Sequence, residues 1–397
     1  MSPLLLSAFT ATSCLGRGVA PTLDALREAR SGLRPCAFET VRLDTCIGEV
    51  DGVDDTRLPE GLDAFECRNN RLAWLGLSQD GMLQAVQAAA GRYGPERVGV
   101  FLGTSTSGIL ESEIAYRQRD AQSGALPADF RYAGAHNTYS VAAFALRALQ
   151  LAGPAVVISS ACSSSGKVFA SAQRAITAGL IDAALVGGVD SLCLTTLYGF
   201  HSLQLVSAAP CRPFDLARDG ISIGEAAAFA LLERVPEAPA DDAVLLLGYG
   251  ESSDAYHMSS PHPQGRGARE AMDKALAAAA LAPAAIDYIN FHGTGTPSND
   301  ESEARAVAGT LGEEVPGSST KGATGHTLGA AGALEAVICA LTLRAQFLPA
   351  GVNTTHVDPQ LQVNYQLQSR PARVRRVMSN SFGFGGSNCS LIFGRPA

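Results

Sequence analysis

The chain has 397 residues, of which 46% are apolar, and a net charge of −8 with an isoelectric point near 5.4. A chain of this length and composition buries a large core, which predicts two domains or one large domain with an internal repeat. The negative charge disfavours nucleic acid and anionic membrane surfaces as partners. With 41 glycines and only 6% aromatic residues, the composition is typical of an α/β fold with close-packed helices and tight turns.

The cysteines and the apolar stretches exclude further classes of protein. Nine cysteines form no CxxC pair and no cluster with zinc spacing, and their odd number argues against a disulfide framework, so we expect no metal site. The longest apolar stretches, 275–286 and 328–343, contain Pro283 or Glu335 and are not expected to span a bilayer. The N-terminus lacks the basic region and cleavage site typical of a signal peptide, and we expect a cytoplasmic protein.

Strands and alanine-rich helices alternate along the first part of the chain, joined by turns of small residues. The expected strands are 4–8, 97–102, 156–159, 183–189 and 226–232, and the expected helices are 21–29 and 164–178. A linker rich in Pro, Ala and Asp follows at 235–242.

The second part of the chain repeats this plan. The expected strands are 244–252, 286–291, a short one near Gly317, 377–381 and 390–393, and the expected helices are 268–280, 302–311 and 329–343. We therefore place a domain boundary in the linker, which gives an N-terminal half of residues 1–240 and a C-terminal half of residues 241–397.

Cys162 directly follows an apolar strand and precedes a helix, with small residues on both sides. A thiol at a helix N-terminus is close to the positive end of the helix dipole and to free N–H groups, so we expect its pKa to fall below the usual value of about 8.5. The position predicts a nucleophile. Taken alone, the segment is explained equally well by a buried structural cysteine.

Two histidines and a lysine occupy similar turns in the second half. His292 ends the strand 286–291, and Lys321 and His326 lie in a turn of small residues after the strand near Gly317. Ligands of open α/β sheets bind at the carboxyl ends of strands. Singly, a capping histidine and a solvated lysine are the simpler interpretations. Together with the cysteine, these residues predict one catalytic site.

Acyl transfer to a cysteine also needs N–H donors for the oxyanion that forms. The backbone N–H of the nucleophile can supply one donor. The glycine-rich segment 380–388, which lies between two expected strands, can supply another.

In this order, the segments resemble those of the elongating β-ketoacyl-(acyl carrier protein) synthases of the thiolase superfamily, over essentially the whole chain. The segments that carry the resemblance are SACSS at 160–164, RPFD at 212–215 with RDG at 218–220, SDAYHMSSP at 253–261, HGTGTP at 292–297 with Glu303, KGATGH at 321–326 and NSFGFGGSN at 380–388. The resemblance implies an α/β fold, a thiolase-like five-layer αβαβα sandwich with two pseudo-duplicated halves.

The resemblance also implies a decarboxylative Claisen condensation with malonyl-(acyl carrier protein). In that reaction Cys162 holds the acyl chain as a thioester, and His292 and His326 hydrogen-bond the malonyl carbonyl and stabilise the enolate. Lys321 is implied to set the charge and orientation around the histidines. No cofactor is implied, because the acyl carrier protein carries the phosphopantetheine.

The same resemblance assigns roles to residues around the catalytic set. The implied residues are Phe384, Gly383 and Phe382 for the oxyanion hole and gate, Thr294 and Thr296 for the pantetheine arm, Glu303 and Glu335 as structural acidic residues, and Asp254 in a gating loop.

The implied partner is an acidic acyl carrier protein, and the implied assembly is a homodimer. The N-terminal strand departs from the family pattern, and the assignment to type I or type II stays open. This leaves a second hypothesis, a specialised enzyme for polyene or polyketide chains that pairs with a chain-length-factor-like subunit lacking the cysteine. A third, a non-catalytic scaffold, is disfavoured because the full catalytic set is present.

The candidate residues for docking the carrier protein are Arg68 and Arg71, with Arg370, Arg373, Arg375 and Arg376. A solvated charged surface explains these arginines equally well.

Overall fold

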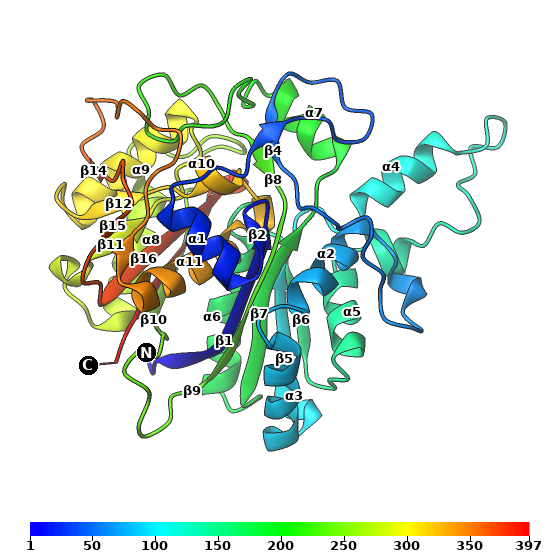
Figure 1. Ribbon diagram of the computed structural model, residues 1–397, viewed down its shortest axis with the longest axis horizontal. Helices are drawn as coiled ribbons and strands as arrows, with labels where there is room; N and C mark the ends of the chain where they lie inside the picture. Colours follow the sequence, from blue (N-terminus) through cyan, green and yellow to red (C-terminus); the bar gives the residue numbers. More distant parts are fainter. Residues whose placement is uncertain (397) are drawn as a thin grey trace.

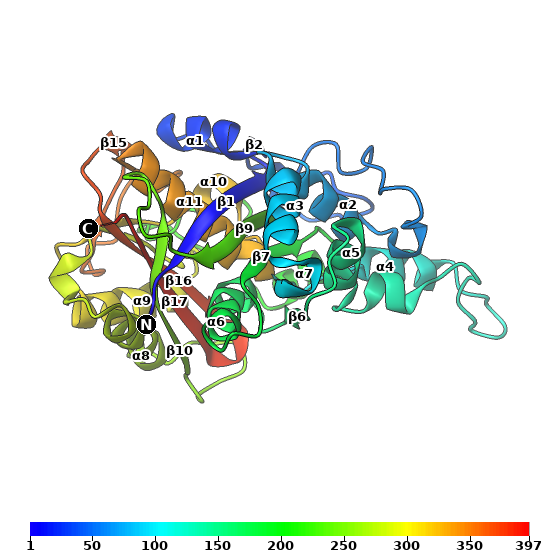
Figure 2. The same cartoon turned by 90° about the horizontal axis from the view of Figure 1, so that it is seen from below.

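The structure is a computed structural model, and it describes residues 1–396. Its main strands form two runs that share one order. In Figure 1 the first run lies near the centre and the second toward the left, and Figure 2 shows the same elements from below. The first run is β6 (Ala155–Ile158), β5 (Val98–Gly103), β7 (Ala183–Asp190), β9 (Ala226–Arg234) and β1 (Leu4–Ser13). The second run is β12 (Pro316–Ser318), β11 (Tyr288–Asn290), β16 (Arg376–Gly383), β17 (Ser387–Gly394) and β10 (Leu245–Ser253).

The two runs also repeat the direction of each strand pair. β5 is parallel to β6 and β7, and β9 is antiparallel to β7 and β1. In the same way, β11 is parallel to β12 and β16, and β17 is antiparallel to β16 and β10. This repeat confirms the expected duplication. The boundary between residues 240 and 241 falls between β9 and β10 and stays a prediction.

Helices form three layers around the two runs. The middle layer is α6 (Ser164–Thr177) and α11 (Ala331–Ala345), which pack together in a core shared by both halves. The outer layer over the first run is α2 (Arg68–Leu77), α3 (Met82–Tyr93) and α5 (Ser140–Ala148), and the outer layer over the second run is α8 (Arg266–Ala279) and α9 (Pro297–Thr310). The arrangement is the expected five-layer αβαβα sandwich.

α11 is apolar on all sides because it lies between two sheets. The stretch Leu328–Ala345 is the one helical segment in residues 1–396 that is long and apolar enough to cross a membrane, and 89% of it is buried inside the fold. An apolar surface all round is typical of a helix at the centre of a large protein. Packing between the two halves therefore accounts for its composition.

Every strand and helix expected from the sequence is present, with ends that shift by a few residues. α9 begins at Pro297 rather than at 302, because proline fits the first turn of a helix, where its missing N–H is not needed. Several helices were not expected from the sequence. They are α2, α3, α5, α4 (Ile109–Arg117), α7 (Leu194–Ser202) and the single turn α10 (Lys321–Thr324).

Arg68 begins α2 and is buried, so the prediction that it binds the carrier protein is wrong. Its side chain is 2% exposed and is bonded to Glu225 at 2.6 Å and to Asp54 at 2.8 Å. Arg71, on the next turn, lies beside Glu66 and Asp54. These two carboxylates offset the charge of Arg71, and its role in carrier docking stays a prediction.

The buried pair of Arg68 and Glu225 gives a stability prediction. Replacing one partner leaves an unpaired buried charge, so Arg68→Ala is expected to lower the free energy of unfolding by about 3 kcal/mol or more in equilibrium urea unfolding. Arg71→Ala, on a neighbour whose side chain is 21% exposed, is the matched control and is expected to cost less than about 1 kcal/mol. Equal effects of the two changes would contradict the assignment of Arg68 to the core.

Candidate active site

A cavity of about 600 Å³, including its open mouth, leads from the surface to Cys162. It lies at the carboxyl ends of β6, β11 and β16, where the two halves meet. Cys162, His292 and His326 line its floor, and Phe382 and Phe384 line one wall. All three floor residues are at most 5% exposed, so their chemistry is shielded from bulk water.

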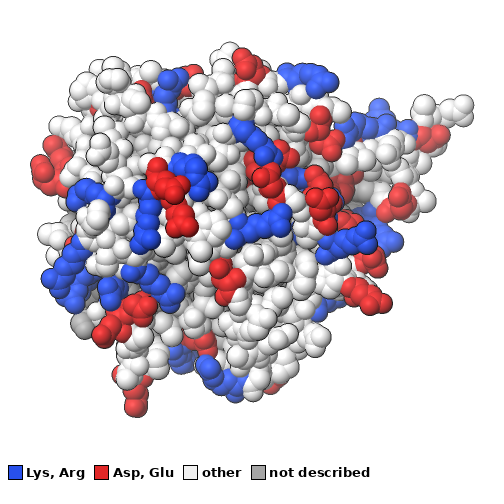
Figure 3. Space-filling view, viewed as in Figure 1, with Lys and Arg blue, Asp and Glu red and all other residues white. Residues whose placement is uncertain are grey.

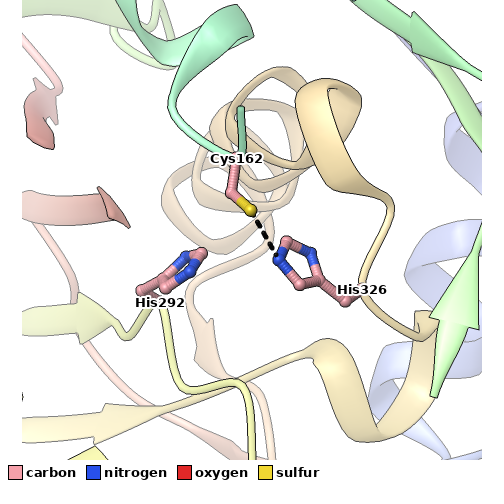
Figure 4. Close-up of side chains that lie close together, drawn as sticks. All are labelled: Cys162, His292 and His326. Carbon is pink, nitrogen blue, oxygen red and sulfur yellow. Dashed lines mark hydrogen bonds between the residues drawn. The ribbon is translucent and has the colours of Figure 1, made fainter. Parts of the chain in front are cut away.

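Cys162 lies in a tight turn between β6 and α6. The preceding residue, Ala161, has φ of 53°, a left-handed conformation that is strained for a residue with a side chain and is often found at functional turns. Gly383 packs directly against this turn, and a Cβ there would lie 2.8 Å from the carbonyl oxygen of Ser160. The sulfur lies 3.0 Å from Nε2 of His326 (Figure 4).

His292 follows β11, and two buried side chains hold it in place. Glu303 accepts hydrogen bonds from the backbone N–H groups of His292 and Gly293, both at 2.8 Å, and so fixes the turn that carries the ring. Nδ1 of the ring lies 3.4 Å from Nζ of Lys321. Because an ammonium group only donates, Nδ1 accepts, and the proton of the neutral ring is assigned to Nε2.

The backbone of His326 forms an isolated β-bridge with Ile223, and its ring has the same tautomer as that of His292. Its N–H donates to the carbonyl of Ser222 at 2.7 Å, and its own carbonyl accepts from Gly224 at 3.0 Å. The N–H of Leu328 lies 3.3 Å from Nδ1, which therefore accepts. The Nε2–H groups of His326 and His292 are thus both available on the side of Cys162 (Figure 4).

Burial and the charge of Lys321 keep both rings neutral. Loss of hydration lowers the pKa of His292 and that of His326 well below 6.5, and the nearby ammonium lowers them further. Lys321 itself is 1% exposed and contacts Glu335 and the carbonyl of His292. Burial raises the pKa of Glu335 to about 7, an increase that Lys321 partly offsets. Two neutral N–H donors therefore face one point above the cysteine.

The expectation of a lowered cysteine pKa is wrong. Burial raises the pKa of the Cys162 thiol to about 11, and Lys321 and the N–H of Phe384 offset only part of the increase. The sulfur lies at the floor of a deep cavity, and removal of water there penalises the thiolate more than the helix N-terminus favours it. The resting cysteine is therefore a thiol, and its proton must leave during the reaction.

Ligand atoms of Cys162, His292 and His326 lie within 4.8 Å of one another, which is a spacing that metal sites also show. The surroundings favour an anion instead. The lone pairs at Nδ1 of both rings are already taken, both Nε2 atoms carry protons, and Lys321 places a positive charge behind His292. The cluster is therefore suited to an oxygen that gains negative charge.

The glycine-rich loop carries Phe384 at the cavity wall. The N–H groups of Phe384 and Cys162 both face the sulfur and lower its pKa, so they lie beside the point where a thioester oxygen becomes negative. The Phe384 ring packs against Phe200 of α7, with 5.5 Å between ring centroids. Asp254 accepts from Asn388 at 2.8 Å, and its N–H donates to Gly386 at 2.9 Å. The segment around Asp254 is thus bonded to the loop that carries Phe384.

Thr294 and Thr296 also line the cavity. Their hydroxyl groups lie 2.8 Å apart and both are mostly buried, so one hydroxyl is free to bond a group that enters the cavity. Asp300 accepts from the N–H groups of Phe214 and Gly295 and holds this turn. The structure therefore brings the residues expected for the pantetheine arm to the cavity.

Some residues that build the site were missed from the sequence. Asn380 bonds Glu303 at 3.1 Å and extends the support behind His292, and its place in the NSFGFGGSN segment was a usable signal. Asp300 closely follows the HGTGTP segment at 292–297, and that position was a usable signal as well. Asp190, at the end of β7, carries no such signal, because its contacts are with loops distant in sequence.

The remaining docking candidates lie far from the cavity mouth. Arg370 begins the short strand β15 (Arg370–Pro371), and Arg376 begins β16, whose other end, Gly383, lines the cavity. The eight residues of β16 span roughly 25 Å. Figure 3 shows basic side chains most frequent at the lower left of that face, the region where Figure 1 places the C-terminus. The role of these arginines in carrier docking stays a prediction.

The five-layer fold with this site defines a condensing enzyme of the thiolase fold. The family described as "Beta-ketoacyl synthase, N-terminal domain" matches residues 55–238, and "Beta-ketoacyl synthase, C-terminal domain" matches residues 243–355. The chain is 32% identical to 3-oxoacyl-(acyl-carrier-protein) synthase 2 of Coxiella burnetii, over 99% of this chain and 98% of that protein. The chain belongs to the β-ketoacyl synthase family.

Solved structures agree with this assignment. A chain in the structure of the ketosynthase ApeO in complex with its chain length factor ApeC, from Xenorhabdus doucetiae, is 40% identical with a TM-score of 0.89, and the match covers 100% of this chain and 98% of that chain. A chain of the ishigamide ketosynthase/chain length factor is 27% identical with a TM-score of 0.90, and the match covers 100% of both chains.

The raised thiol pKa gives a prediction for the pH dependence of alkylation. The rate at which iodoacetamide modifies Cys162, followed by mass spectrometry of its peptide, is expected to be still rising at about pH 9, because only the thiolate reacts. Lys321→Met is expected to move the curve to higher pH, since the ammonium favours the thiolate. A wild-type rate that is constant above about pH 8 would contradict the assignment; the partly exposed Cys36 in the same digest controls for the reagent.

Proposed function

We propose that this chain is the catalytic subunit of an elongating β-ketoacyl-(acyl carrier protein) synthase, which joins an acyl chain on Cys162 to malonyl-(acyl carrier protein). The observation that carries the proposal is the convergence of one buried thiol and two neutral Nε2–H groups at the floor of one cavity. The reaction yields β-ketoacyl-(acyl carrier protein), carbon dioxide and free carrier protein. No cofactor is needed beyond the phosphopantetheine of the carrier.

In the first step, the sulfur of Cys162 attacks the thioester carbonyl of the acyl carrier. The N–H groups of Cys162 and Phe384 hold the oxygen that becomes negative. The carbon–sulfur bond to the carrier then breaks, and the departing pantetheine sulfur takes up the proton that Cys162 loses. The Nε2–H of His326, 3.0 Å from the sulfur, stabilises the thiolate while the proton is in transit.

In the second step, malonyl-(acyl carrier protein) enters and Thr294 or Thr296 bonds its pantetheine arm. His292 and His326 donate to the malonyl thioester oxygen, and loss of carbon dioxide leaves an enolate on that oxygen. The enolate carbon attacks the acyl thioester on Cys162, the bond from the acyl carbon to sulfur breaks, and the sulfur takes up a proton from solvent water. No strong base is required, because decarboxylation creates the carbanion.

A second chain of the same fold is the proposed partner. β6 is the open edge of the first run, and its four side chains are only partly buried although all are apolar. The complex of ApeO with ApeC favours a chain-length-factor-like partner over a homodimer, and thus a specialised polyene or polyketide pathway. We also propose that the enzyme is cytoplasmic. Its reaction is nearest to those of the elongating type I and type II synthases.

The proposed nucleophile predicts a covalent intermediate. Incubation with an acyl-(acyl carrier protein) is expected to increase the intact mass of the protein by one acyl group, located on the Cys162 peptide, and Cys162→Ala is expected to show no adduct and no condensation product. Cys389→Ala, which removes a buried cysteine in β17 outside the cavity, is the matched control and keeps the adduct. Absence of an adduct on the wild-type protein, both alone and with its partner subunit, would contradict the proposed function.

The proposed partner surface predicts the effect of a proline on β6. The carbonyl of Pro154 accepts from Val100 of β5, and that of Ile158 accepts from Thr104, the residue after β5. By the two-residue period of a strand, the N–H of Val157 therefore points away from the sheet. Val157→Pro is expected to leave the fold intact and to shift the protein to monomer in sedimentation analysis, because the open edge loses a donor. Val156→Pro, which breaks the inner ladder, is the destabilising control. A dimer that survives Val157→Pro would exclude pairing through β6.

A further inference from the structure

Asp190 ends β7 and is fully buried, yet it takes no part in the chemistry described above. It does not line the cavity. Instead, its carboxylate accepts from six donors. They are the hydroxyl of Thr104 at 2.7 Å, the N–H and hydroxyl of Ser105 at 2.7 and 2.5 Å, the N–H and hydroxyl of Thr106, both at 2.9 Å, and the N–H of Gly329 at 2.5 Å.

These donors come from both halves of the protein. Residues 104–106 follow β5 in the first half, whereas Gly329 follows His326 by three residues in the second half. The close approach of this backbone to Asp190 requires glycine at position 329, since a Cβ there would lie 2.8 Å from the Asp190 carboxylate and 2.9 Å from the backbone nitrogen of Ser105. Asp190 therefore ties the segment that carries His326 to the first half.

The contact with Gly329 acts on the residue just before it. Leu328 has φ of 52°, which is unfavourable for a residue with a side chain. Two contacts hold it there: its side chain is buried among apolar residues, and the next N–H is bonded to Asp190. In this conformation the N–H of Leu328 points at Nδ1 of His326. That single donor decides which nitrogen of His326 carries the proton.

We propose that Asp190 is a positioning residue for the condensation: by holding the Leu328–Gly329 turn, it keeps His326 oriented with its Nε2–H toward Cys162. The inference rests on the proposed function. Asp190 makes this contribution through the backbone of another segment and touches neither the substrate nor the reacting atoms.

The electrostatics agree with a role in geometry rather than in activation. The negative charge of Asp190 raises the pKa of the Cys162 thiol and so works against the thiolate. A carboxylate at this point is therefore not explained by activation of the nucleophile. It is explained by the donors that it gathers, because a buried carboxylate with six donors fixes their backbone firmly.

Asp190→Asn preserves the shape of the side chain but removes the charge and one acceptor oxygen. In steady-state condensation we expect kcat to fall by roughly tenfold or more, as when the partner of a catalytic histidine is removed, with KM for malonyl-(acyl carrier protein) within about twofold of wild type. Glu233→Gln is the matched control. Glu233 is a buried carboxylate opposite Ala183, at the other end of β7, and bonds Arg92 and Tyr93. It is expected to leave kcat within about twofold.

A double-mutant cycle with His326→Ala separates positioning from a general loss of structure. The readout is the rate constant for decarboxylation of malonyl-(acyl carrier protein) in a single turnover. If Asp190 acts through His326, Asp190→Asn slows the wild-type protein but has no further effect on the His326→Ala protein. The inference is overturned if Asp190→Asn slows both backgrounds by the same factor, or if Glu233→Gln matches the effect of Asp190→Asn.

Ser105→Ala is the second variant if Asp190→Asn does not fold. It removes one donor to the carboxylate and a 3.3 Å contact with the N–H of Gly329, and it is expected to lower kcat in the same direction by a smaller factor. An unchanged kcat in Ser105→Ala counts against the inference. If the wild-type protein forms no β-ketoacyl product, the proposed function fails instead, so the two failures are distinguishable.

Discussion

The two site histidines are oriented by what lies behind each ring. Lys321 stands behind His292, and the N–H of Leu328 stands behind His326. Both neighbours only donate, so each neutral ring accepts at Nδ1 and presents Nε2–H to the cavity. If either neighbour were an acceptor, the proton of the adjacent histidine would lie on Nδ1 instead of Nε2. The cavity would then offer a lone pair where the enolate oxygen needs a donor.

Keeping Lys321 charged at this depth has a cost that the rest of the core must offset. A buried ammonium is unfavourable unless it is paired and fully hydrogen-bonded. Glu335 supplies the pairing, and it comes from α11, the helix that fills the space between the two sheets. The same helix therefore holds the halves together and sets the charge behind His292. The electrostatics of the site depend on the packing of the whole molecule, not only on the residues that line the cavity.

The sequence predicted the parts of the site that are local in the chain. Cys162, His292 and His326 each follow a strand and sit among small residues, and this pattern is visible without a structure. The burial of Arg68 could not be seen, because its partner Glu225 lies 157 residues away. For the same reason the raised pKa of Cys162 was missed: it reflects enclosure by segments from the other half. The α/β class and the duplication were predictable from the repeated order of strands and helices, and the five-layer sandwich from the family resemblance. The outer helices α2 to α5 were not predicted.

The duplication explains why neither half can hold a complete site. β6 and β12 occupy the same place in their runs; the first leads to Cys162 and the second to Lys321 and His326. β7 and β16 are likewise equivalent, and they end at Asp190 and at the loop of Phe384. Asp190, at the end of β7 in the first half, supports His326 of the second half. The loop after β16 in the second half supplies the N–H of Phe384 to Cys162 of the first half. Equivalent positions have thus taken complementary tasks, and the contacts that join Cys162 to the histidines cross between the halves.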